Sequence, residues 1–355
     1  MPPPLTPAIQ VGSIRHPRMK LSRSSKNLTF EATGVRTRAR PALVIGLVNN
    51  VEDLGLRTTE RQFRELIAAA SQNMAVRLRI FALPELNRSA ATQAYVGQYY
   101  EDISNLWTEP VDGLIVTGRQ PTTLQLTDEF CWPTLTKLFD WAHEYTTSTI
   151  WSCLAAHAAV LHASRIMRHP FHEKLSGVYT STKVIDHPLL IGIPQRWRIP
   201  QSRYNGLREH ELRFNGYEVL SRSSNVDPDI FIRDMKSLFV YVQGHPEYEP
   251  HTLLREYRRD VAAFLAGENE RYPKLPQGYF DRETAAILSA FRQKALRDRD
   301  ANLLTSFPLV AVEGKLDHSW HKSAVRFYFN WLSYIAAQKA QQFDLAKLSS
   351  VREHT

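Results

Sequence analysis

Cysteine, histidine and glutamate residues in two distant segments could supply a nucleophile, a base and a carboxylate that orients the base. Cys153 follows a predicted strand over residues 147–152 and precedes a small-residue helix that begins at Leu154. N–H groups at a helix start stabilise a thiolate and can hold an oxyanion, so Cys153 is a candidate nucleophile. His245 and Glu247 end another predicted strand, and their spacing projects both side chains to the same side. Together the three residue types predict covalent catalysis through the cysteine.

Each candidate also has a simpler interpretation. A free cysteine is commonly a small buried core residue, and the His-Pro-Glu segment could merely form a capped turn before the helix near Pro250. His169 and His172 lack accompanying metal ligands, which favours ordinary loop histidines over a metal site. Gly113 and Gly118 lack the spacing of a dinucleotide-binding or phosphate-binding loop. Neither a metal nor a bound cofactor is therefore expected.

The pattern of apolar residues predicts an α/β fold. Continuous apolar runs, typical of strands buried on both faces, lie at residues 41–48, 76–83, 113–117 and 147–152. Amphipathic stretches of helical length lie between them at 58–72, 91–105 and 129–145. Strands that alternate with helices predict parallel crossovers and a doubly wound, mostly parallel sheet. Ligands in such a sheet bind beyond the carboxyl ends of the strands, where Cys153 is expected to lie.

The second half of the chain is predicted to extend or cover this sheet and then to become helical. Shorter strand-like runs lie at 177–184, 217–222, 229–233 and 237–243. Helices are expected at 154–166, 250–266, 282–297 and 320–342, with a loop at 268–276. The last two helices could pack on the body or on a second subunit.

Composition and charge indicate a soluble enzyme with a basic leader. The chain has 355 residues, of which 43% are hydrophobic and 23% charged, and no apolar run is long enough to span a membrane. Its two cysteines, Cys131 and Cys153, argue against a disulfide scaffold. Residues 1–42 carry eight basic side chains against Glu31, which is +7 of the net +8, so the body gives no electrostatic reason to expect nucleic acid. We expect a disordered leader at 1–40, with an RNA-binding or organelle-targeting arm as the alternative, a single domain at 41–345 and a flexible tail at 346–355.

An ordered series of motifs between Pro41 and Phe343 resembles the MetA-type homoserine O-acyltransferases, the homoserine O-succinyl- and O-acetyltransferases. The motifs are Asp112-Gly-Leu-Ile-Val-Thr-Gly118, Asp128-Glu-Phe-Cys-Trp132, Thr147-Ser-Thr-Ile-Trp-Ser-Cys153, Glu173-Lys-Leu-Ser-Gly-Val178, His187-Pro-Leu-Leu190, Pro200-Gln-Ser-Arg203, Gly244-His-Pro-Glu-Tyr248, Glu256-Tyr-Arg-Arg-Asp260 and Phe329-Asn-Trp-Leu-Ser-Tyr334. The resemblance implies a flavodoxin-like fold related to class I glutamine amidotransferases, with additional C-terminal helices. It also implies a cytoplasmic homodimer that acts in methionine biosynthesis with homoserine and an acyl-CoA as substrates, with no nucleic-acid or membrane partner.

The resemblance assigns a role to each candidate residue. Cys153 is the acylated nucleophile, His245 the base and Glu247 its orienter. Backbone N–H groups of Cys153 and Leu154 are expected to hold the oxyanion. Lys174, Ser202, Arg203 and Arg259 are expected at the substrate pocket, where an arginine can grip a carboxylate through two parallel bonds.

The chain departs from the family pattern at three places. Cys-Trp-Gly-Ala becomes Cys153-Leu-Ala-Ala, Met-Pro-x-Lys becomes Asn49-Asn-Val-Glu-Asp-Leu-Gly55 without its lysine, and Thr-Gly-Ala-Pro becomes Thr117-Gly-Arg-Gln-Pro121. In that last loop the family carries glycine with succinyl donors and glutamate with acetyl donors, and Thr122 aligns there. Thr122 carries no charge to repel a second carboxylate and Arg119 could attract one, which favours succinyl-CoA. The alternatives are an acetyl donor, another amino-acid hydroxyl as acceptor, a cysteine hydrolase or amidotransferase-like enzyme, and a non-catalytic homologue.

Overall fold

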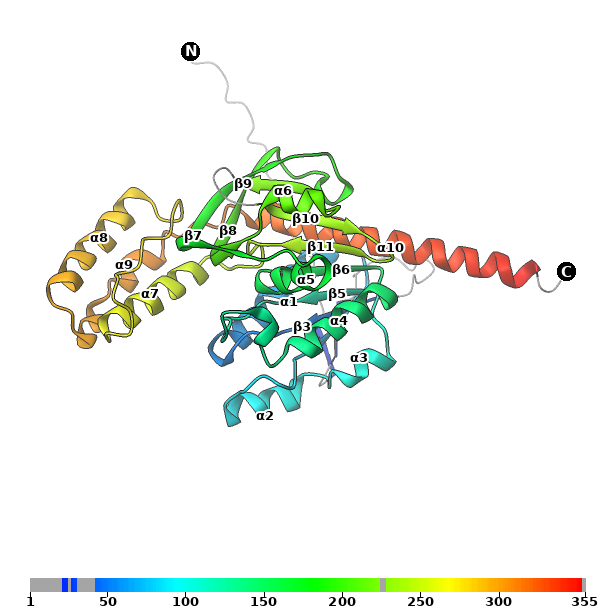
Figure 1. Ribbon diagram of the computed structural model, residues 1–355, viewed down its shortest axis with the longest axis horizontal. Helices are drawn as coiled ribbons and strands as arrows, with labels where there is room; N and C mark the ends of the chain where they lie inside the picture. The colour runs from blue at the N-terminus through cyan, green and yellow to red at the C-terminus, as the bar shows by residue number, and fades with distance from the viewer. Residues whose placement is uncertain (1–20, 25–26, 31–41, 224–227, 353–355) are drawn as a thin grey trace, which may run out of the picture.

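The computed structural model describes residues 21–24, 27–30, 42–223 and 228–352, and the side chains of residues 42–223 and 228–343. One sheet of eleven strands runs through the body (Figure 1). Its order is β1-β2-β4-β3-β5-β6-β11-β10-β9-β7-β8. The strands are β1 Leu21–Ser24, β2 Asn27–Phe30, β3 Leu43–Val48, β4 Val76–Phe81, β5 Gly113–Val116, β6 Ser148–Ser152, β7 His169–Lys183, β8 Arg196–Gly206, β9 Glu218–Ser223, β10 Pro228–Asp234 and β11 Leu238–Val242.

The centre of the sheet is parallel, as predicted. Strands β4, β3, β5, β6 and β11 are paired in parallel, which in chain order is the flavodoxin-like arrangement 2-1-3-4-5. All of these strands except β4 and β3 are buried throughout, and those two have a single half-buried residue each, which explains their continuous apolar sequences. The predicted α/β class and the strand predictions for this part are confirmed.

Antiparallel strands extend the sheet on both sides. Strands β10, β9, β7 and β8 follow β11, and β2 and β1 follow β4. The runs predicted at 177–184, 217–222 and 229–233 correspond to β7, β9 and β10, although β7 starts earlier, at His169. Strand β8 was missed because its sequence, Arg-Trp-Arg-Ile-Pro-Gln-Ser-Arg-Tyr-Asn-Gly, mixes polar and apolar residues without a clear period.

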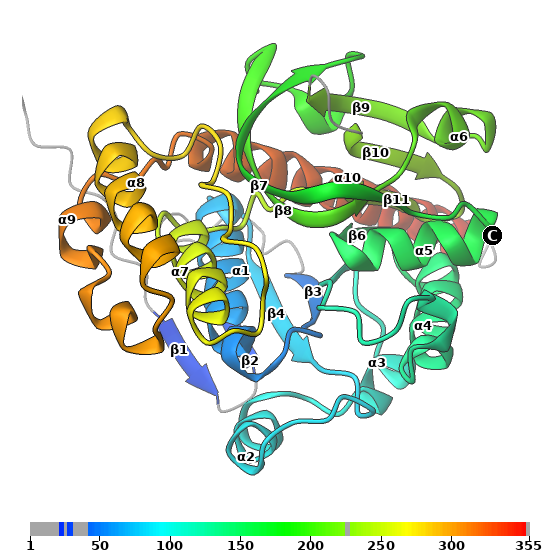
Figure 2. The same cartoon turned by 60° about the vertical axis from the view of Figure 1, so that its left-hand side comes forward.

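Helices cover both faces of the sheet (Figure 2). Apolar residues of α1 and α10 share one core cluster with one face, whereas those of α3, α4 and α5 share a second cluster with the other face. The helices are α1 Asp53–Ser71, α2 Ala90–Tyr99, α3 Ser104–Thr108, α4 Trp132–Tyr145, α5 Leu154–Ser164, α6 Glu209–Phe214, α7 Thr252–Leu265, α8 Arg282–Arg297, α9 Leu309–Glu313 and α10 His321–Arg352, with 3-10 turns η1 Leu126–Asp128, η2 Pro188–Leu190 and η3 Ala301–Ser306. The helix predicted at 91–105 is two helices, α2 and α3, because the chain is extended at Tyr100 and forms a bridge at Glu101.

The segment after β11 forms a helical lobe beside the sheet (Figure 1). Helices α7, α8 and α9 pack on one another around a third apolar cluster that includes Tyr257, Phe264, Phe291 and Trp320. Residues 268–276 contain no helix or strand, as predicted. Helix α7 runs from this lobe back to the edge of the sheet near β8, so its first turns can contribute side chains to a site at the carboxyl ends of the strands.

The two ends of the chain contain more regular structure than the sequence suggested. Within the leader for which we expected disorder, residues 21–24 and 27–30 form the hairpin strands β1 and β2. The other leader residues lie outside the described part of the chain. Helix α10 continues to Arg352, into the segment expected to be a flexible tail, and its last turns extend beyond the sheet in Figure 1.

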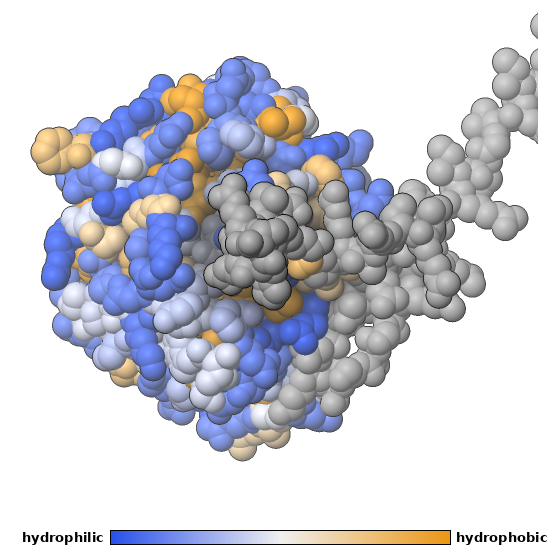
Figure 3. Space-filling view, turned by 90° about the vertical axis from the view of Figure 1, so that its right-hand side faces the viewer, coloured by the Kyte–Doolittle hydropathy of each residue, from blue (hydrophilic) through white to orange (hydrophobic). Residues whose placement is uncertain are grey.

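The described surface is mixed in polarity. On the face shown in Figure 3, hydrophilic residues predominate and hydrophobic ones occur in small groups. Among the described residues no helix is both long enough and apolar enough to cross a bilayer. In the same part of the chain, no cluster of three histidine, cysteine or acidic side chains is arranged to hold a metal ion.

Candidate active site

The junction between β6 and α5 holds Cys153 in a strained backbone conformation. Cys153 has φ 52° and ψ −116°, a combination that non-glycine residues rarely adopt. It is the N-cap of α5, and its own N–H donates to the carbonyl of Val242 at 2.8 Å. This turn places the half-exposed thiol at the carboxyl end of the sheet, next to β11. Strain at such a position is typical of a nucleophile on a sharp strand-to-helix turn.

Strand pairing brings His245 to this thiol. Ser152 and Val242 are partners in the parallel ladder, so the residues that follow them leave the sheet side by side. The turn at Gly244 lies against β8, where an added Cβ would be 2.8 Å from the carbonyl oxygen of Pro200. The His245 N–H donates to that same carbonyl at 2.8 Å. The imidazole and the thiol of Cys153 are then close enough for the two side chains to interact.

Glu247 and Tyr248 hold the imidazole of His245 in place. The Nδ1 atom of His245 lies 2.8 Å from Oε1 of Glu247, whose side chain is only 4% exposed. The ring of Tyr248 stacks on the imidazole with a centroid separation of 4.3 Å and an interplanar angle of 16°. Because Nδ1 faces the carboxylate, Nε2 is the nitrogen that faces the sulfur. The predicted nucleophile, base and orienter thus form one connected set.

The charges around His245 favour its protonated form. Burial by itself lowers the pKa of the imidazole, but the neighbouring charges of Cys153 and Glu247 and the hydrogen bonds to both raise the pKa well above its ordinary value. A cationic ring beside the sulfur stabilises a thiolate. The site therefore favours a cationic imidazole next to the sulfur of Cys153.

The N–H of Leu154 is a candidate oxyanion donor, whereas that of Cys153 is not. Our expectation that the Cys153 N–H would help to hold the oxyanion was wrong, because Val242 already accepts its hydrogen bond. The loop after β5 approaches the Leu154 N–H closely: a Cβ on Gly118 would lie 2.7 Å from that nitrogen. Only glycine permits this approach, so Gly118 helps to shape the space next to the Leu154 N–H.

A polar cluster lies on the other side of His245, formed by β7, β8 and α7. The hydroxyl of Tyr248 donates to Oε1 of Glu256 at 2.7 Å, and the hydroxyl of Ser202 donates to Oε2 of the same carboxylate. The Nζ of Lys174 donates to Oδ2 of Asp260 at 2.7 Å and lies 3.8 Å from Glu256. The cluster therefore places two carboxylates and an ammonium group on the side of Tyr248, whose ring stacks on the imidazole of His245.

The structure places the two predicted substrate arginines differently. Arg259 lies at the edge of the polar cluster, where its Nη2 donates to Oδ1 of Asp260 at 2.9 Å and its side chain is 62% exposed. Arg203 points to the opposite side of β8 from Ser202, as strand alternation requires, and is buried. Its Nε donates to Oε1 of Gln201 at 2.9 Å and its Nη1 donates to the backbone carbonyl of Asn205 at 2.8 Å. The structure thus brings Arg259 but not Arg203 to the cluster.

Arg203 instead belongs to a buried polar network with Gln243 and His157. Its Nη1 lies 3.2 Å from Oε1 of Gln243, and the same oxygen lies 2.9 Å from Nε2 of His157. His157 stands one helical turn after Cys153 and is fully enclosed, so burial and then the positive charge of Arg203 lower its pKa to about 3. Since Gln243 immediately precedes Gly244 and His245, this network connects α5, which begins after Cys153, to the turn that carries His245.

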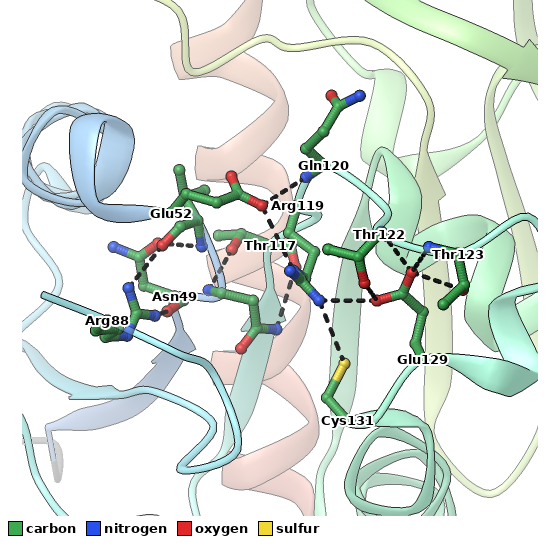
Figure 4. Close-up of polar contacts among 12 residues, drawn as sticks. Asn49, Glu52, Arg88, Thr117, Arg119, Gln120, Thr122, Thr123, Glu129 and Cys131 are labelled. Carbon is green, nitrogen blue, oxygen red and sulfur yellow. Dashed lines mark hydrogen bonds and ion pairs between the residues drawn. The ribbon is translucent and has the colours of Figure 1, made fainter.

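The loop after β5 is organised by Glu129 (Figure 4). The backbone N–H and hydroxyl of Thr122 donate to this carboxylate at 2.6 and 3.0 Å, and the N–H of Thr123 donates to it at 2.8 Å. The Nη1 of Arg119 donates to it at 2.8 Å. Burial raises the pKa of Glu129, but the hydrogen bonds from Thr123 and Thr122 outweigh this effect and lower it overall. Thr122 is thus engaged with Glu129.

A small cavity of about 20 Å³ lies between this loop and the start of α5. Gly118, Arg119, Glu129, Leu154 and Ala155 contribute to its lining. Its walls are mainly apolar, and the two charged residues that reach it neutralise each other. The cavity therefore connects the predicted oxyanion donor with the predicted acyl-specificity residue Arg119.

Sequence reasoning missed Glu129, Glu256 and Gly118 as contributors to the site. The spacing of Glu256 and Asp260, four residues apart, places both acids on one face of α7 and could have signalled the polar cluster. Nothing near Glu129 in the sequence indicates that its carboxylate is buried against the loop. The role of Gly118 depends on its contact with Leu154, which no local pattern reveals.

This chain is similar in sequence to known proteins over most of its length. The family model described as "Homoserine O-succinyltransferase" matches residues 13–342. A homoserine O-succinyltransferase of Rhodopseudomonas palustris is 43% identical over 85% of this chain and 91% of its own length. One from Bradyrhizobium japonicum is 42% identical over 88% of this chain and 97% of its own length. Among solved structures, a glutamine amidotransferase of Thermotoga maritima aligns with a TM-score of 0.44 at 13% identity over 84% of this chain and 99% of its own.

Proposed function

The chain belongs to the homoserine O-succinyltransferase family, and we propose that it transfers a succinyl group from succinyl-CoA to the hydroxyl of homoserine, in methionine biosynthesis. The observation that carries this proposal is the connected set of Cys153, His245 and Glu247 beside a polar cluster that contains Glu256. Succinyl-CoA enters as a co-substrate. A cytoplasmic homodimer remains our expectation from the family resemblance, and light scattering of the purified protein tests the dimer.

The first half-reaction is acylation of the cysteine. The Cys153 thiolate attacks the thioester carbonyl, and the carbonyl oxygen becomes an oxyanion that the Leu154 N–H stabilises. One such donor typically lowers the barrier by about 3 to 4 kcal/mol. The bond between the carbonyl carbon and the CoA sulfur then breaks, and the leaving CoA thiolate takes the proton of the His245 imidazolium. An acyl-cysteine and a neutral imidazole remain.

The second half-reaction uses the imidazole as a base. An acylated Cys153 carries no charge, so one of the two neighbouring charges that raise the pKa of His245 is gone. The neutral ring accepts the proton of the homoserine hydroxyl while the oxygen attacks the acyl-cysteine. The acyl–sulfur bond breaks, the thiolate returns beside the imidazolium, and the cycle is ping-pong.

The polar cluster is suited to an amino acid. Glu256 can accept hydrogen bonds from the substrate ammonium group, and the exposed guanidinium of Arg259 can grip its carboxylate. Lys174 and Ser202 position Glu256 through their contacts with it, and Ser202 can also reach the substrate. At the other end of the site, Arg119 is our candidate for the second carboxylate of the succinyl group, with Thr122 fixing the loop through Glu129.

Mass spectrometry and steady-state kinetics test the proposal. Mixing the protein with succinyl-CoA in the absence of homoserine should add a succinyl group to Cys153, and Cys153→Ser should remove the thioester adduct. Rates measured with succinyl-CoA and acetyl-CoA, each against homoserine and serine, should be highest for succinyl-CoA with homoserine. Negligible rates with homoserine from both donors would overturn the assigned acceptor. An acyl adduct that only water releases would favour a hydrolase.

A further inference from the structure

The strongest unassigned feature lies where the loops after β3 and β5 meet. In this strand order the two strands flank the point at which the chain reverses direction across the sheet, and ligands of such folds bind there. The N–H of Asn50 donates to Oγ1 of Thr117 at 2.8 Å, which joins the two loops. Arg88 supports the first loop by donating to the carbonyl of Val51 at 2.9 Å. The side chain of Glu52 is thereby directed to the second loop (Figure 4).

Glu52 fills a site that has the chemistry of a carboxylate receptor. Its Oε1 accepts the backbone N–H of Gln120 at 2.9 Å and lies 3.4 Å from Nε of Arg119. A backbone N–H beside a guanidinium N–H is a donor pair suited to one carboxylate. The Nε of Arg119 is a buried atom whose only partner within the described residues is this long ion pair with Glu52. The receptor therefore has a donor, the Nε of Arg119, to which Glu52 makes no hydrogen bond.

The two carboxylates that contact Arg119 differ in how firmly they are held. Glu129 is 4% exposed and receives hydrogen bonds from Thr122 and Thr123 as well as from Arg119, so it fixes the guanidinium. Glu52 is 48% exposed and contacts Arg119 only at 3.4 Å. Because Glu52 is half-exposed and the separation is long, this pair should contribute about 1 kcal/mol or less to stability, so the Glu52 carboxylate is the displaceable one.

The receptor lies close to the reacting carbonyl. Arg119 follows Gly118, which lies against the N–H of Leu154, and both Arg119 and Leu154 line the small cavity. In a succinyl thioester, two methylene groups separate the thioester carbonyl from the second carboxylate. With its carbonyl at Leu154, this short chain would extend along the cavity that Arg119 also lines.

We propose that Glu52 is a specificity-determining residue: its carboxylate occupies the receptor formed by Arg119 and the Gln120 N–H until the distal carboxylate of a succinyl donor displaces it. This inference rests on the proposed function and deepens it. A succinyl group replaces Glu52 with an equivalent anion and keeps Arg119 paired. An acetyl group offers no such anion and leaves Glu52 where it is.

The test compares donor kcat/KM values of the full-length enzyme and Glu52→Gln. In a ping-pong cycle this constant reports only the acylation half-reaction, so it isolates the donor site. Removing the competing charge should raise kcat/KM for succinyl-CoA about fivefold. This factor corresponds to the interaction free energy of a half-exposed ion pair. The value for acetyl-CoA should stay the same within twofold. Glu65→Gln, which removes an exposed charge on α1 away from the receptor, is the matched control and should change neither value.

Arg119→Met separates displacement from simple charge repulsion. This variant removes the guanidinium, so kcat/KM for succinyl-CoA should fall on the order of tenfold, with a much smaller change for acetyl-CoA. In the double variant with Glu52→Gln, the gain from losing Glu52 should disappear, because there is no receptor left to vacate. If the double variant kept the full rise in kcat/KM caused by Glu52→Gln, displacement from Arg119 would be overturned. The effect of Glu52 would then be simple repulsion of the succinyl carboxylate.

Two results contradict the inference directly. One is an unchanged succinyl-CoA value in Glu52→Gln, and the other is an equal rise with both donors. The proposed function fails differently, because then neither donor leaves an acyl group on Cys153 in any variant. Mass spectrometry of the same samples therefore tells the two failures apart.

Discussion

Replacing Glu247 with glutamine should impair acylation by removing the charge that supports the His245 imidazolium. Glutamine keeps the size of the side chain and can still offer an oxygen to Nδ1 of His245, which now lies 2.8 Å from the carboxylate. The change therefore isolates the charge. Without the carboxylate, the pKa of His245 should fall, and the imidazolium should lose its proton at a lower pH than in the parent enzyme.

The structure sets the size of the effect. Two unit charges about 4 Å apart near a protein surface interact by about 4 kcal/mol, which is equivalent to about three pKa units. Glu247 is 4% exposed, so solvent screens this interaction little. Part of the loss is recovered because the glutamine oxygen still accepts a hydrogen bond. We therefore expect kcat/KM for the donor to fall about 10²- to 10³-fold, within the range of general acid–base catalysis.

Two measurements check this prediction. The upper limb of the pH profile of kcat/KM for succinyl-CoA should move to lower pH in Glu247→Gln, and alkylation of Cys153 by iodoacetamide at neutral pH should slow. Glu249→Gln is the matched control, because Glu249 lies two residues further on and pairs with the exposed Arg61 at 2.7 Å. That control should stay within twofold of the parent. A parental pH profile and alkylation rate in Glu247→Gln would refute the reasoning, and a change confined to stability in urea would show that Glu247 acts only structurally.

Three further predictions concern the backbone and the buried network. Gly118→Ala should lower donor kcat/KM at least about tenfold, because a Cβ would lie 2.7 Å from the Leu154 nitrogen; parental kinetics would contradict the close approach. Cys153→Gly should abolish activity yet raise the free energy of unfolding in urea by about 1 kcal/mol, because glycine tolerates the φ of 52°; a less stable variant would argue against strain. As the pH falls from 6.5 toward 3, the free energy of unfolding should drop by up to about 1.4 kcal/mol per pH unit. The reason is that His157 binds a proton in the unfolded state but stays neutral in the folded state, where its pKa is lowered to about 3. His157→Gln should lack this contribution in pH-dependent urea titrations, and an identical slope in the two proteins would contradict it.

Local sequence was sufficient to predict the central parallel strands and the candidate reactive groups. The apolar runs that became β3, β4, β5 and β6 are buried in a parallel sheet, where both faces of each strand are covered. The same patterns placed Cys153 at a strand-to-helix junction and paired His245 with Glu247 two residues on. These features depend on residues within a few positions of one another, which is the distance over which periodicity and turn chemistry act.

The contacts that complete the site depend instead on how distant segments pair. The register between Ser152 and Val242 places the Cys153 thiol next to the His245 imidazole. The same register pairs the Cys153 N–H, which we had expected in the oxyanion hole, with the carbonyl of Val242. The fold likewise turns Arg203 inward and brings Glu52 to Arg119 across 67 positions of the chain. A sequence shows which side chains carry charge and where a strand can form. Which charges finally face each other is set by sheet order and register, because these bring together residues that have no influence on each other along the chain.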